Sequence, residues 1–226
     1  MRFVEGEAAL LLKDYAIISD LHIGFEEDLE DRGYIIPDQT PKFLQRIEKL
    51  REKAKKLVIL GDVKHKIFLK RRKILYDFLA KISALFESVI IVKGNHDGKI
   101  EEYTCHFANI EVVNEFRIGH SLLMHGNKNP SIENIKDVDT LMLGHFHSSY
   151  RIKTKIGIIE KRKVWTIYDF DNEKYFKDKK VKTNIRTIFS FPCFNNFFEG
   201  GGEKLGPLAK YLAEHEVFTL DLVKIV

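Results

Sequence analysis

Apolar residues in the first half of the chain fall into short continuous runs and longer periodic segments. Residues 8–19 contain two apolar runs separated by Lys13 and Asp14, which predicts two short strands or a hairpin. Residues 57–62 and 88–95 are short apolar runs that end in glycine and polar residues, as buried strands often do. We expect these segments to form strands of one sheet.

Two longer segments show helical periodicity. In residues 38–56 and 70–87, apolar residues recur every three or four positions with charged residues between them, which predicts amphipathic helices. Asp38 and Pro41 suit the start of the first helix. The order strand, helix, strand, helix, strand indicates a parallel or mixed sheet with crossover helices.

The second half of the chain is richer in expected strands. We expect strands at residues 111–118, 121–126, 139–145, 163–170 and 187–191, a last helix near 204–215 and a final strand at 217–226. No internal repeat or linker interrupts the chain, and its length suits one domain with a sizeable core. The expected unit is a single domain over residues 1–226, with a motif-bearing core at 14–150 and a β-rich part at 151–226.

Composition narrows the class of protein. Of the 226 residues, 44% are hydrophobic and 31% are charged, which is typical of a soluble globular protein. No apolar run reaches the roughly 18 residues of a membrane span, and the N-terminus lacks the basic start of a signal peptide. The isolated Cys105 and Cys193 favour a reducing interior, so we expect a cytoplasmic protein with no membrane partner. The net charge of +4 permits anionic substrates but does not by itself indicate nucleic acid.

Five short polar motifs, each at the end of an apolar run, contain most of the candidate chemistry. They are ISDLH with Asp20 and His22, GDVKH with Asp62 and His65, GNHD with Asn95, His96 and Asp97, MHG with His125, and GHFH with His145 and His147. Six of the nine histidines lie in these motifs. Because ligands of open α/β sheets gather beyond the carboxyl ends of the strands, we expect the motifs to converge. Their Asp, Asn and His residues would then suit a pair of divalent metal ions.

The spacing within the motifs predicts how the ligands point. Asp20 and His22 are two residues apart, so on an extended backbone both would point to one side, and His145 and His147 share this spacing. Asp62 follows a Gly-Asp turn directly after a strand, which makes it our candidate for a carboxylate that bridges both ions. The oxygen and nitrogen ligands favour Mn²⁺, with Fe or Zn²⁺ as alternatives, over Ca²⁺. A polar strand end with hydrogen-bonded side chains explains any single motif equally well, but five motifs in this order argue against it.

The series D-x-H, GD-x-x-H, GNHD, H-G and GH-x-H resembles the calcineurin-like metallophosphoesterases. Within that superfamily, DLHIG and GDVKH are similar to the SbcD-related branch, and RGYIIP (32–37) and FPCFNNFFEGG (191–201) to its smaller stand-alone members. The resemblance implies a fold of the α+β or α/β class. This fold is a four-layer α/β/β/α sandwich of two mixed β-sheets, with a dinuclear metal site at the carboxyl ends of the strands.

The resemblance also implies a role for each motif residue. One ion would be held by Asp20, His22, Asp62 and His147, and the other by Asp62, Asn95, His125 and His145. His96 would be the general acid that protonates the leaving oxygen. His65 stands where many phosphatases of the family have Asp, and in the nuclease branch such a histidine contacts the phosphate or assists the acid. Asp97 would orient neighbouring groups, and an Asp that shapes a tight turn accounts for it equally well.

Two-metal chemistry predicts a phosphoesterase that hydrolyses phosphodiester bonds through a metal-activated hydroxide, with a histidine as general acid. Single-stranded nucleic acid is one candidate substrate, which would make the protein a nuclease. A phosphatase or phosphodiesterase for small metabolites is the alternative among enzymes, and His65 in place of Asp counts modestly against it. A non-catalytic scaffold and a DNA-binding accessory protein are further alternatives, but every expected ligand and His96 are present.

Two basic segments bear on the choice of substrate. Residues 64–73 contain six Lys or Arg, and residues 151–186, expected to form exposed β-hairpins, contain 12 against five Asp or Glu. Both would suit a nucleic-acid strand, but solvated surface is the favoured interpretation. The aromatic residues of 165–176 and of the Phe-rich segment 189–198 are expected in the core. An exposed edge strand or this Phe-rich segment would suit a homodimer, although no pattern requires one.

Overall fold

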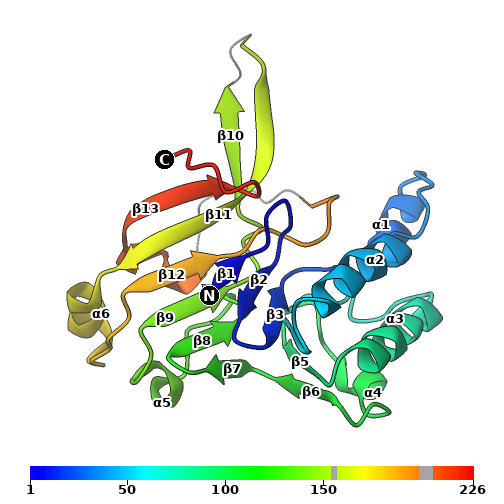
Figure 1. The fold of residues 1–226 in the computed structure, drawn as a ribbon, viewed down its shortest axis with the longest axis horizontal. Helices are drawn as coiled ribbons and strands as arrows, with labels where there is room; N and C mark the ends of the chain where they lie inside the picture. Colours follow the sequence, from blue (N-terminus) through cyan, green and yellow to red (C-terminus); the bar gives the residue numbers. More distant parts are fainter. Residues whose placement is uncertain (154–156, 199–205) are drawn as a thin grey trace.

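The computed structural model describes residues 1–153, 157–198 and 206–226. Its first sheet has the strand order β1 (Arg2–Phe3), β2 (Leu10–Leu12), β3 (Tyr15–Ile18), β4 (Lys56–Ile59), β5 (Ser88–Val92) and β6 (Ile110–Val113) (Figure 1). The first three strands pair antiparallel, and β3 to β6 pair parallel. The expected hairpin within residues 8–19 and the buried strands within 57–62 and 88–95 are confirmed.

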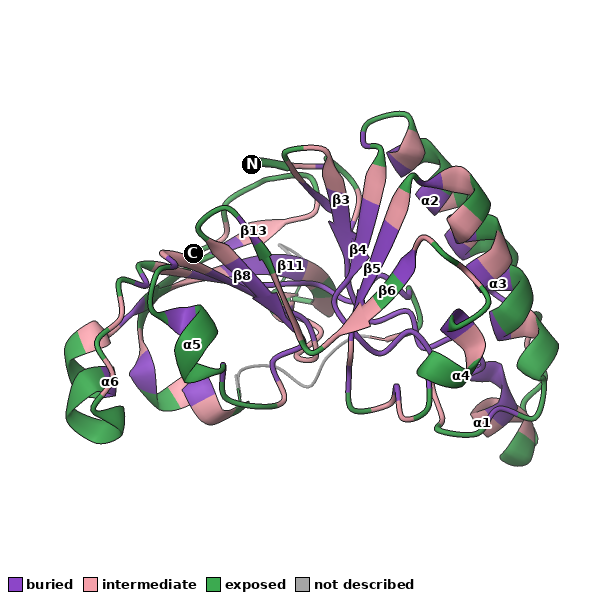
Figure 2. Cartoon of the chain, turned by 90° about the horizontal axis from the view of Figure 1, so that it is seen from below, coloured by how far each residue is buried: buried purple, intermediate pink, exposed green. Residues whose placement is uncertain are grey.

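Helices α2 (Thr40–Arg51) and α3 (Arg72–Leu85) cover the outer face of this sheet (Figure 2). Their apolar stripes bury Phe43 and Ile47 of α2 and Phe78 and Ile82 of α3. Both helices connect parallel strands, so the expected crossover arrangement is confirmed. Two short helices, α1 (Glu26–Asp31) and α4 (Glu101–Thr104), follow β3 and β5.

The second sheet contains the later strands. Its order is β10 (Ser149–Lys153), β11 (Ile159–Phe170), β12 (Thr187–Ser190), β9 (Thr140–Leu143), β8 (Ser121–Met124) and β7 (Glu115–Ile118), and β13 (Leu212–Thr219) also pairs with β11. Strands β8, β9 and β12 are parallel, whereas the other pairs are antiparallel. Helices α5 (Ile132–Ile135) and α6 (Asn172–Lys179) cover the outer face, which completes the expected four-layer α/β/β/α sandwich (Figure 2).

The inner faces of the two sheets share one apolar core. Val58 and Ile90 of the first sheet pack in it with Leu123, Met142 and Trp165 of the second. Side chains alternate between the two faces of a strand, so neighbouring residues pack against the helices instead. Burial on both faces explains why these strands are continuous apolar runs in the sequence.

Three expectations differ from the structure. The segment 111–118 is divided between β6 and β7, so the chain passes from one sheet to the other at Asn114. The prediction of a helix near 204–215 is wrong for the described residues of that range, because Gly206–Tyr211 forms a 3₁₀ turn and β13 begins at Leu212. Pairing with the edge of β11 outweighs the weak helical propensity of that segment. Helix α6 lies where hairpins were expected, and its N-cap is Asp171, whose side chain accepts a hydrogen bond of 2.9 Å from the Lys174 backbone N–H.

Within residues 1–153, 157–198 and 206–226, no helix is both long enough and apolar enough to cross a membrane.

Candidate metal centre

The five polar motifs converge at one edge of the sandwich. Each motif follows a parallel strand, namely β3, β4, β5, β8 or β9, at its carboxyl end. The two sheets face each other, so side chains from both meet there. The structure brings together all seven candidate metal ligands: Asp20, His22, Asp62, Asn95, His125, His145 and His147.

A first group consists of Asp20, His22 and His147. One potential ligand atom from each lies within 4.8 Å of the other two. His147 Nε2 lies 3.2 Å from His22 Nε2 and 3.3 Å from Asp20 Oδ1. Three electron-pair donors therefore face one point, where a cation would satisfy all of them.

A second group consists of Asp62, His125 and His145, whose ligand atoms also lie within 4.8 Å of one another. His125 Nε2 lies 3.3 Å from Asp62 Oδ2 and 3.1 Å from Asn95 Oδ1. The other ring nitrogen, Nδ1, lies 2.8 Å from the Leu60 carbonyl, which can only accept. His125 Nδ1 therefore carries a hydrogen, and Nε2 is the ring nitrogen that faces the cluster and would bind an ion once deprotonated.

Asp62 joins the two groups. Its Oδ2 lies 3.8 Å from His22 Nε2 in the first group and 3.3 Å from His125 Nε2 in the second. Its Oδ1 accepts a hydrogen bond of 2.9 Å from the backbone N–H of His96. Asp62 is thus placed as a bridging carboxylate would be.

These distances fit divalent metal ions. Coordination bonds of about 2.0–2.2 Å place neighbouring ligand atoms roughly 3–3.5 Å apart, which matches most of the separations in both groups. The donors are carboxylate and amide oxygens and imidazole nitrogens. The thiol of Cys193 contributes no ligand, because it lies 2.8 Å from the backbone carbonyl of Asp20. This donor set suits Mn²⁺, Fe or Zn²⁺.

The backbone at the ligands is not extended, contrary to expectation. Asp20, His22, Asp62, His145 and His147 have φ values of 56°, 49°, 50°, 71° and 47°. They make up five of the nine non-glycine residues with positive φ in the described parts of the chain. Such conformations cost of order 1–3 kcal/mol each and persist where surrounding contacts impose them. Left-handed turns, rather than the alternation of an extended strand, direct these side chains inward.

Two motif glycines permit close approach at the ligands. A Cβ atom at Gly94 would lie 2.2 Å from Asp62 Oδ1, and one at Gly61 would lie 2.3 Å from His125 Nδ1. Neither distance is compatible with a side chain. The glycines of GNHD and GDVKH therefore make room for the ligands of neighbouring motifs.

Burial and neighbouring charges set the protonation of the ligands. Burial would raise the pKa of Asp20, but the imidazoles of His147, His125 and His22 outweigh it and hold this pKa well below its usual range. Burial lowers the pKa of His22 to about 3 despite the two carboxylates, so its imidazole is neutral. Burial opposes charge on His125, but the hydrogen bond to Asp62 and the charge of Asp20 outweigh it and raise the pKa to about 9.

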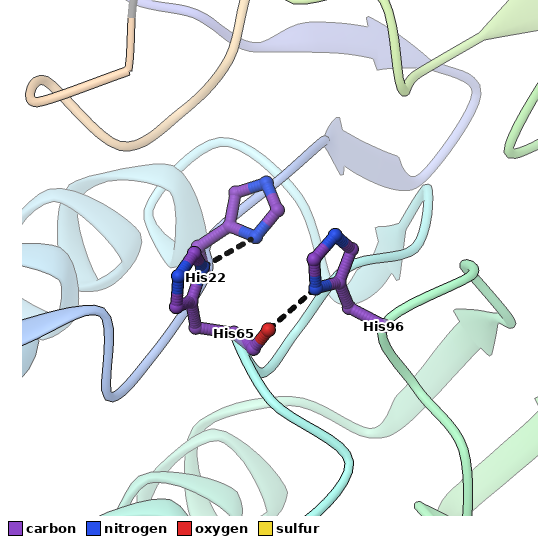
Figure 3. A group of neighbouring side chains, drawn as sticks. All are labelled: His22, His65 and His96. Carbon is purple, nitrogen blue, oxygen red and sulfur yellow. Dashed lines mark hydrogen bonds between the residues drawn. The ribbon is translucent and has the colours of Figure 1, made fainter. Parts of the chain in front are cut away.

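His22 of the first group also lies close to two further imidazoles, those of His65 and His96 (Figure 3). His65 Nδ1 lies 3.5 Å from His22 Nδ1, and His96 Nδ1 donates to the backbone carbonyl of His65. The rings of His65 and His96 stack with centroids 5.6 Å apart. His65 Nε2 lies 3.0 Å from Asp28 Oδ2, a contact the sequence did not predict because Asp28 belongs to the unpredicted helix α1.

Asp97 lies behind this cluster. Its Oδ2 accepts a 2.9 Å hydrogen bond from the Gly94 N–H, and its Oδ1 accepts one of 3.3 Å from the Lys64 N–H. Burial and the charge of Asp62 raise the pKa of Asp97 to about 6. The residue ties the loop after β5 to the loop after β4.

An aromatic wall borders the first group. The Phe198 ring stacks on His22, with centroids 4.5 Å apart and planes inclined by 25°, and lies 5.8 Å from the ring of His147. Other members of the Phe-rich segment, such as Phe191 and Phe194, are buried as expected. Its continuation at residues 199–201 lies outside the described residues. The sequence contains no signal that separates Phe198 from its core neighbours.

The basic segment 64–73 is largely neutralised. Lys64 is fully buried, Lys66 pairs with Asp28 and Asp31, Lys70 pairs with Asp31, and Arg71 pairs with Glu30. The acidic partners of Lys66, Lys70 and Arg71 all lie on helix α1. The segment is therefore not a polycationic patch, and the alternative of ordinary paired surface charges is the better description.

Comparison with known proteins agrees with this geometry. The family model for calcineurin-like phosphoesterases matches residues 14–217. The chain belongs to this family. The family indicates a hydrolase that acts on phosphoesters, and the convergent carboxylates and imidazoles could hold metal ions. No curated protein matches the chain significantly.

Three solved structures resemble this chain to different degrees. The nuclease MPE of Pseudomonas putida has a TM-score of 0.60 and 18% sequence identity, covering 92% of this chain and 86% of that one. Protein AQ665 of Aquifex aeolicus, whose function is unknown, has a TM-score of 0.43 and 23% identity over 59% of this chain and 79% of that one. A mutant of Vps29 from Entamoeba histolytica has a TM-score of 0.35 and 17% identity over 94% and 99% of the two chains. At 18% identity, the first of these supports the fold of this calcineurin-like chain and not its substrate.

Proposed function

We propose that this protein is a phosphodiesterase that uses two divalent metal ions and acts on single-stranded nucleic acid. One ion would be held by Asp20, His22, Asp62 and His147, and the other by Asp62, Asn95, His125 and His145. The position of Asp62 carries the proposal, because its Oδ2 lies 3.8 Å from His22 Nε2 and 3.3 Å from His125 Nε2. When bound, such a pair of ions acidifies a water molecule and offsets charge on the phosphoryl oxygens.

His96 is the proposed general acid. Its Nδ1 faces the His65 carbonyl, which can only accept, so Nδ1 carries a hydrogen and Nε2 is the nitrogen that exchanges a proton. A departing alkoxide is strongly basic, and a proton from a positioned acid accelerates such a step by about 10²–10⁴-fold. The hydrogen bond from the backbone N–H of His96 to Asp62 Oδ1 holds the proposed acid beside the proposed bridging carboxylate.

His65 is proposed to position His22 and His96 rather than to contact phosphate. If its Nε2–H donates to Asp28 Oδ2 at 3.0 Å, its Nδ1 accepts the N–H of His22 at 3.5 Å. His22 Nε2 is then left as the ligand nitrogen, an orientation that outer partners often impose on metal-binding histidines. Asp97 is proposed to position the loop that carries His96 through the Gly94 N–H.

Several observations support the finer assignments. Phe198 offers an aromatic face beside the first group, on which an unstacked base could rest. A nuclease, the MPE protein of Pseudomonas putida, has a similar fold. The donor set supports Mn²⁺ as the native ion. The free thiols Cys105 and Cys193 agree with a reducing, cytoplasmic location.

The proposal is tested by comparing three substrates in Mn²⁺: bis(p-nitrophenyl) phosphate, p-nitrophenyl phosphate and a labelled single-stranded oligonucleotide. We expect the wild type to hydrolyse both diesters. In His96→Ala, with its metal content unchanged, we expect loss of oligonucleotide cleavage and a smaller loss with bis(p-nitrophenyl) phosphate, because p-nitrophenolate is a weakly basic leaving group that needs little help from a general acid. Hydrolysis of the monoester alone would favour the small-molecule phosphatase. Full metal binding without any hydrolysis would favour the scaffold or the DNA-binding accessory protein.

A further inference from the structure

A β-hairpin projects from the body of the molecule close to the metal centre. It is formed by β10 and the first part of β11, and Figure 1 shows it extending beyond the rest of the second sheet. Its first residue, Ser149, follows the candidate ligand His147 by two positions. The root of the hairpin is therefore covalently tied to the site.

The register of the hairpin separates its charges onto two faces. Ser149 pairs with Lys163, Arg151 with Lys161, and Lys153 with Ile159. Directly opposed residues, and residues two apart on one strand, share a face of a sheet. One face thus carries four cations and no carboxylate among these paired positions: Arg151, Lys153, Lys161 and Lys163. The opposite face carries Tyr150, Ile152, Glu160 and Arg162, and there Arg162 pairs with Glu160.

The basic face begins at the wall of the metal centre. Lys163 Nζ donates to the carbonyls of Cys193 and Asn195, at 2.6 and 2.5 Å. Asn195 in turn holds the ligand loop, because its side chain donates to the Leu21 carbonyl at 2.9 Å. Three residues further along the same segment, Phe198 stacks on His22. From Lys163 outward, the cations continue through Lys161 and Arg151 to Lys153 at the far end of the paired residues.

We propose that this face binds the sugar-phosphate backbone of a single-stranded nucleic acid and leads it to the metal centre. The inference rests on the proposed phosphodiesterase function and identifies where its substrate is held outside the site. Side chains on one face recur about every 6.6 Å along a strand, which suits a periodic polyanion and not a small ester. Arg151 and Lys153 are exposed, whereas Lys66, Lys70 and Arg71 of segment 64–73 are engaged by the acids of α1.

Aromatic side chains at the inner end of the face favour a single strand over a duplex. Phe197 is 53% exposed and packs on Phe25 with ring centroids 5.2 Å apart, next to Phe198. Unstacked bases can rest on such rings, and a duplex keeps its bases stacked inside. The backbone would be held by charge along the hairpin, and the bases would meet phenylalanines at the site.

The test compares two triple variants that remove the same charge. The hairpin variant is Arg151→Gln/Lys153→Gln/Lys161→Gln, and it leaves Lys163 in place because Lys163 supports the loop. The control is Lys174→Gln/Lys177→Gln/Lys179→Gln, on the exposed surface of α6 far from the hairpin (Figure 1). Binding of a fluorescein-labelled single-stranded oligonucleotide, and of the duplex formed with its complement, is measured by anisotropy in EDTA at several salt concentrations. Hydrolysis of bis(p-nitrophenyl) phosphate in Mn²⁺ is measured in parallel.

We expect the hairpin variant to bind the oligonucleotide about tenfold or more weakly. The slope of log K against log salt should fall by about 2, since each lost phosphate contact on a single strand contributes about 0.7. The α6 variant should bind within twofold of the wild type, and all three proteins should hydrolyse the small ester equally. Equal weakening by both variants, weakening by neither, or tighter binding of a duplex would overturn the inference.

The two proposals fail separately. A wild type that hydrolyses the small diester but does not bind the oligonucleotide leaves the metal centre intact and removes the hairpin inference. A wild type that binds the oligonucleotide through the hairpin but hydrolyses no diester removes the proposed catalysis alone.

Discussion

The ammonium group of Lys64 donates a 2.8 Å hydrogen bond to the backbone carbonyl of His96. It also donates to the carbonyls of Lys66 and Ile67, at 2.9 and 3.1 Å, and the residue is 0% exposed. Burial lowers the pKa of Lys64, although the carboxylates of Asp97 and Asp62 oppose this shift. A buried cation therefore joins the loop after β4 to the loop that carries the proposed general acid.

Replacement of Lys64 by Met should destabilise the protein and slow the reaction. The three carbonyls would lose a charged donor inside the protein, which we expect to cost roughly 2–4 kcal/mol in the free energy of unfolding. Urea denaturation measures this cost, and kcat for cleavage of the oligonucleotide, whose leaving alkoxide must be protonated, reports the displacement of His96. The exposed Lys70→Met is the control, with an expected change within about 0.5 kcal/mol. Equal stability of the two variants would show that Lys64 has no supporting role.

Asp62→Asn should weaken both metal sites together. The substitution keeps the shape of the side chain but removes the charge that lies between His22 and His125. We expect loss of at least one ion per protein in metal analysis and a decrease in kcat of about 10³-fold or more. Asp14→Asn, which removes an exposed partner of Lys56, should retain full metal content and activity. Two tightly bound ions in Asp62→Asn would rule out the bridging role.

Asp28→Asn tests the positioning of His65 and His22. An amide cannot orient the His65 ring as a carboxylate does, and loss of such an outer partner typically costs 10–100-fold in metal affinity or activity. We expect about a tenfold loss in metal affinity, measured by calorimetric titration of the metal-free protein. Asp31→Asn is a matched control, because Asp31 also pairs with Lys66, whereas the carboxylate beside His65 is that of Asp28. If the two variants lose affinity equally, the effect belongs to Lys66 and not to His65.

Metal binding should depend on pH through His125. In the metal-free protein, burial disfavours its imidazolium, but Asp62 and Asp20 outweigh burial and raise the pKa to about 9. An ion must displace this proton, so apparent affinity should rise by up to about tenfold per pH unit below pH 9 and level off above it. Calorimetry at pH 7.5 in two buffers of different ionisation enthalpy should detect proton release. Identical heats in the two buffers would contradict the prediction.

Much of the candidate site could be predicted from sequence. Asp20, Asp62, Asn95, His125 and His145 each follow an apolar run, and such runs form parallel strands whose carboxyl ends share one edge. The side-chain directions could not be predicted, because Asp20 and His22 adopt positive φ where an extended backbone was expected. Those turns are held by contacts with another loop, because the backbone N–H groups of Asp20 and His22 donate to the carbonyls of Gly61 and Asp62, at 3.2 and 2.8 Å.

The sequence by itself determined most of the strands, the crossover helices α2 and α3 and the set of candidate ligands, because each depends on the periodicity or identity of residues close together in the chain. Only the tertiary structure decided which charges are exposed and which are engaged. Lys64 and Lys153 are both lysines in basic segments, yet one is buried under three carbonyls and the other lies on an exposed hairpin face. The difference arises from partners distant in sequence, since burial and ion pairing depend on what the fold brings alongside each side chain.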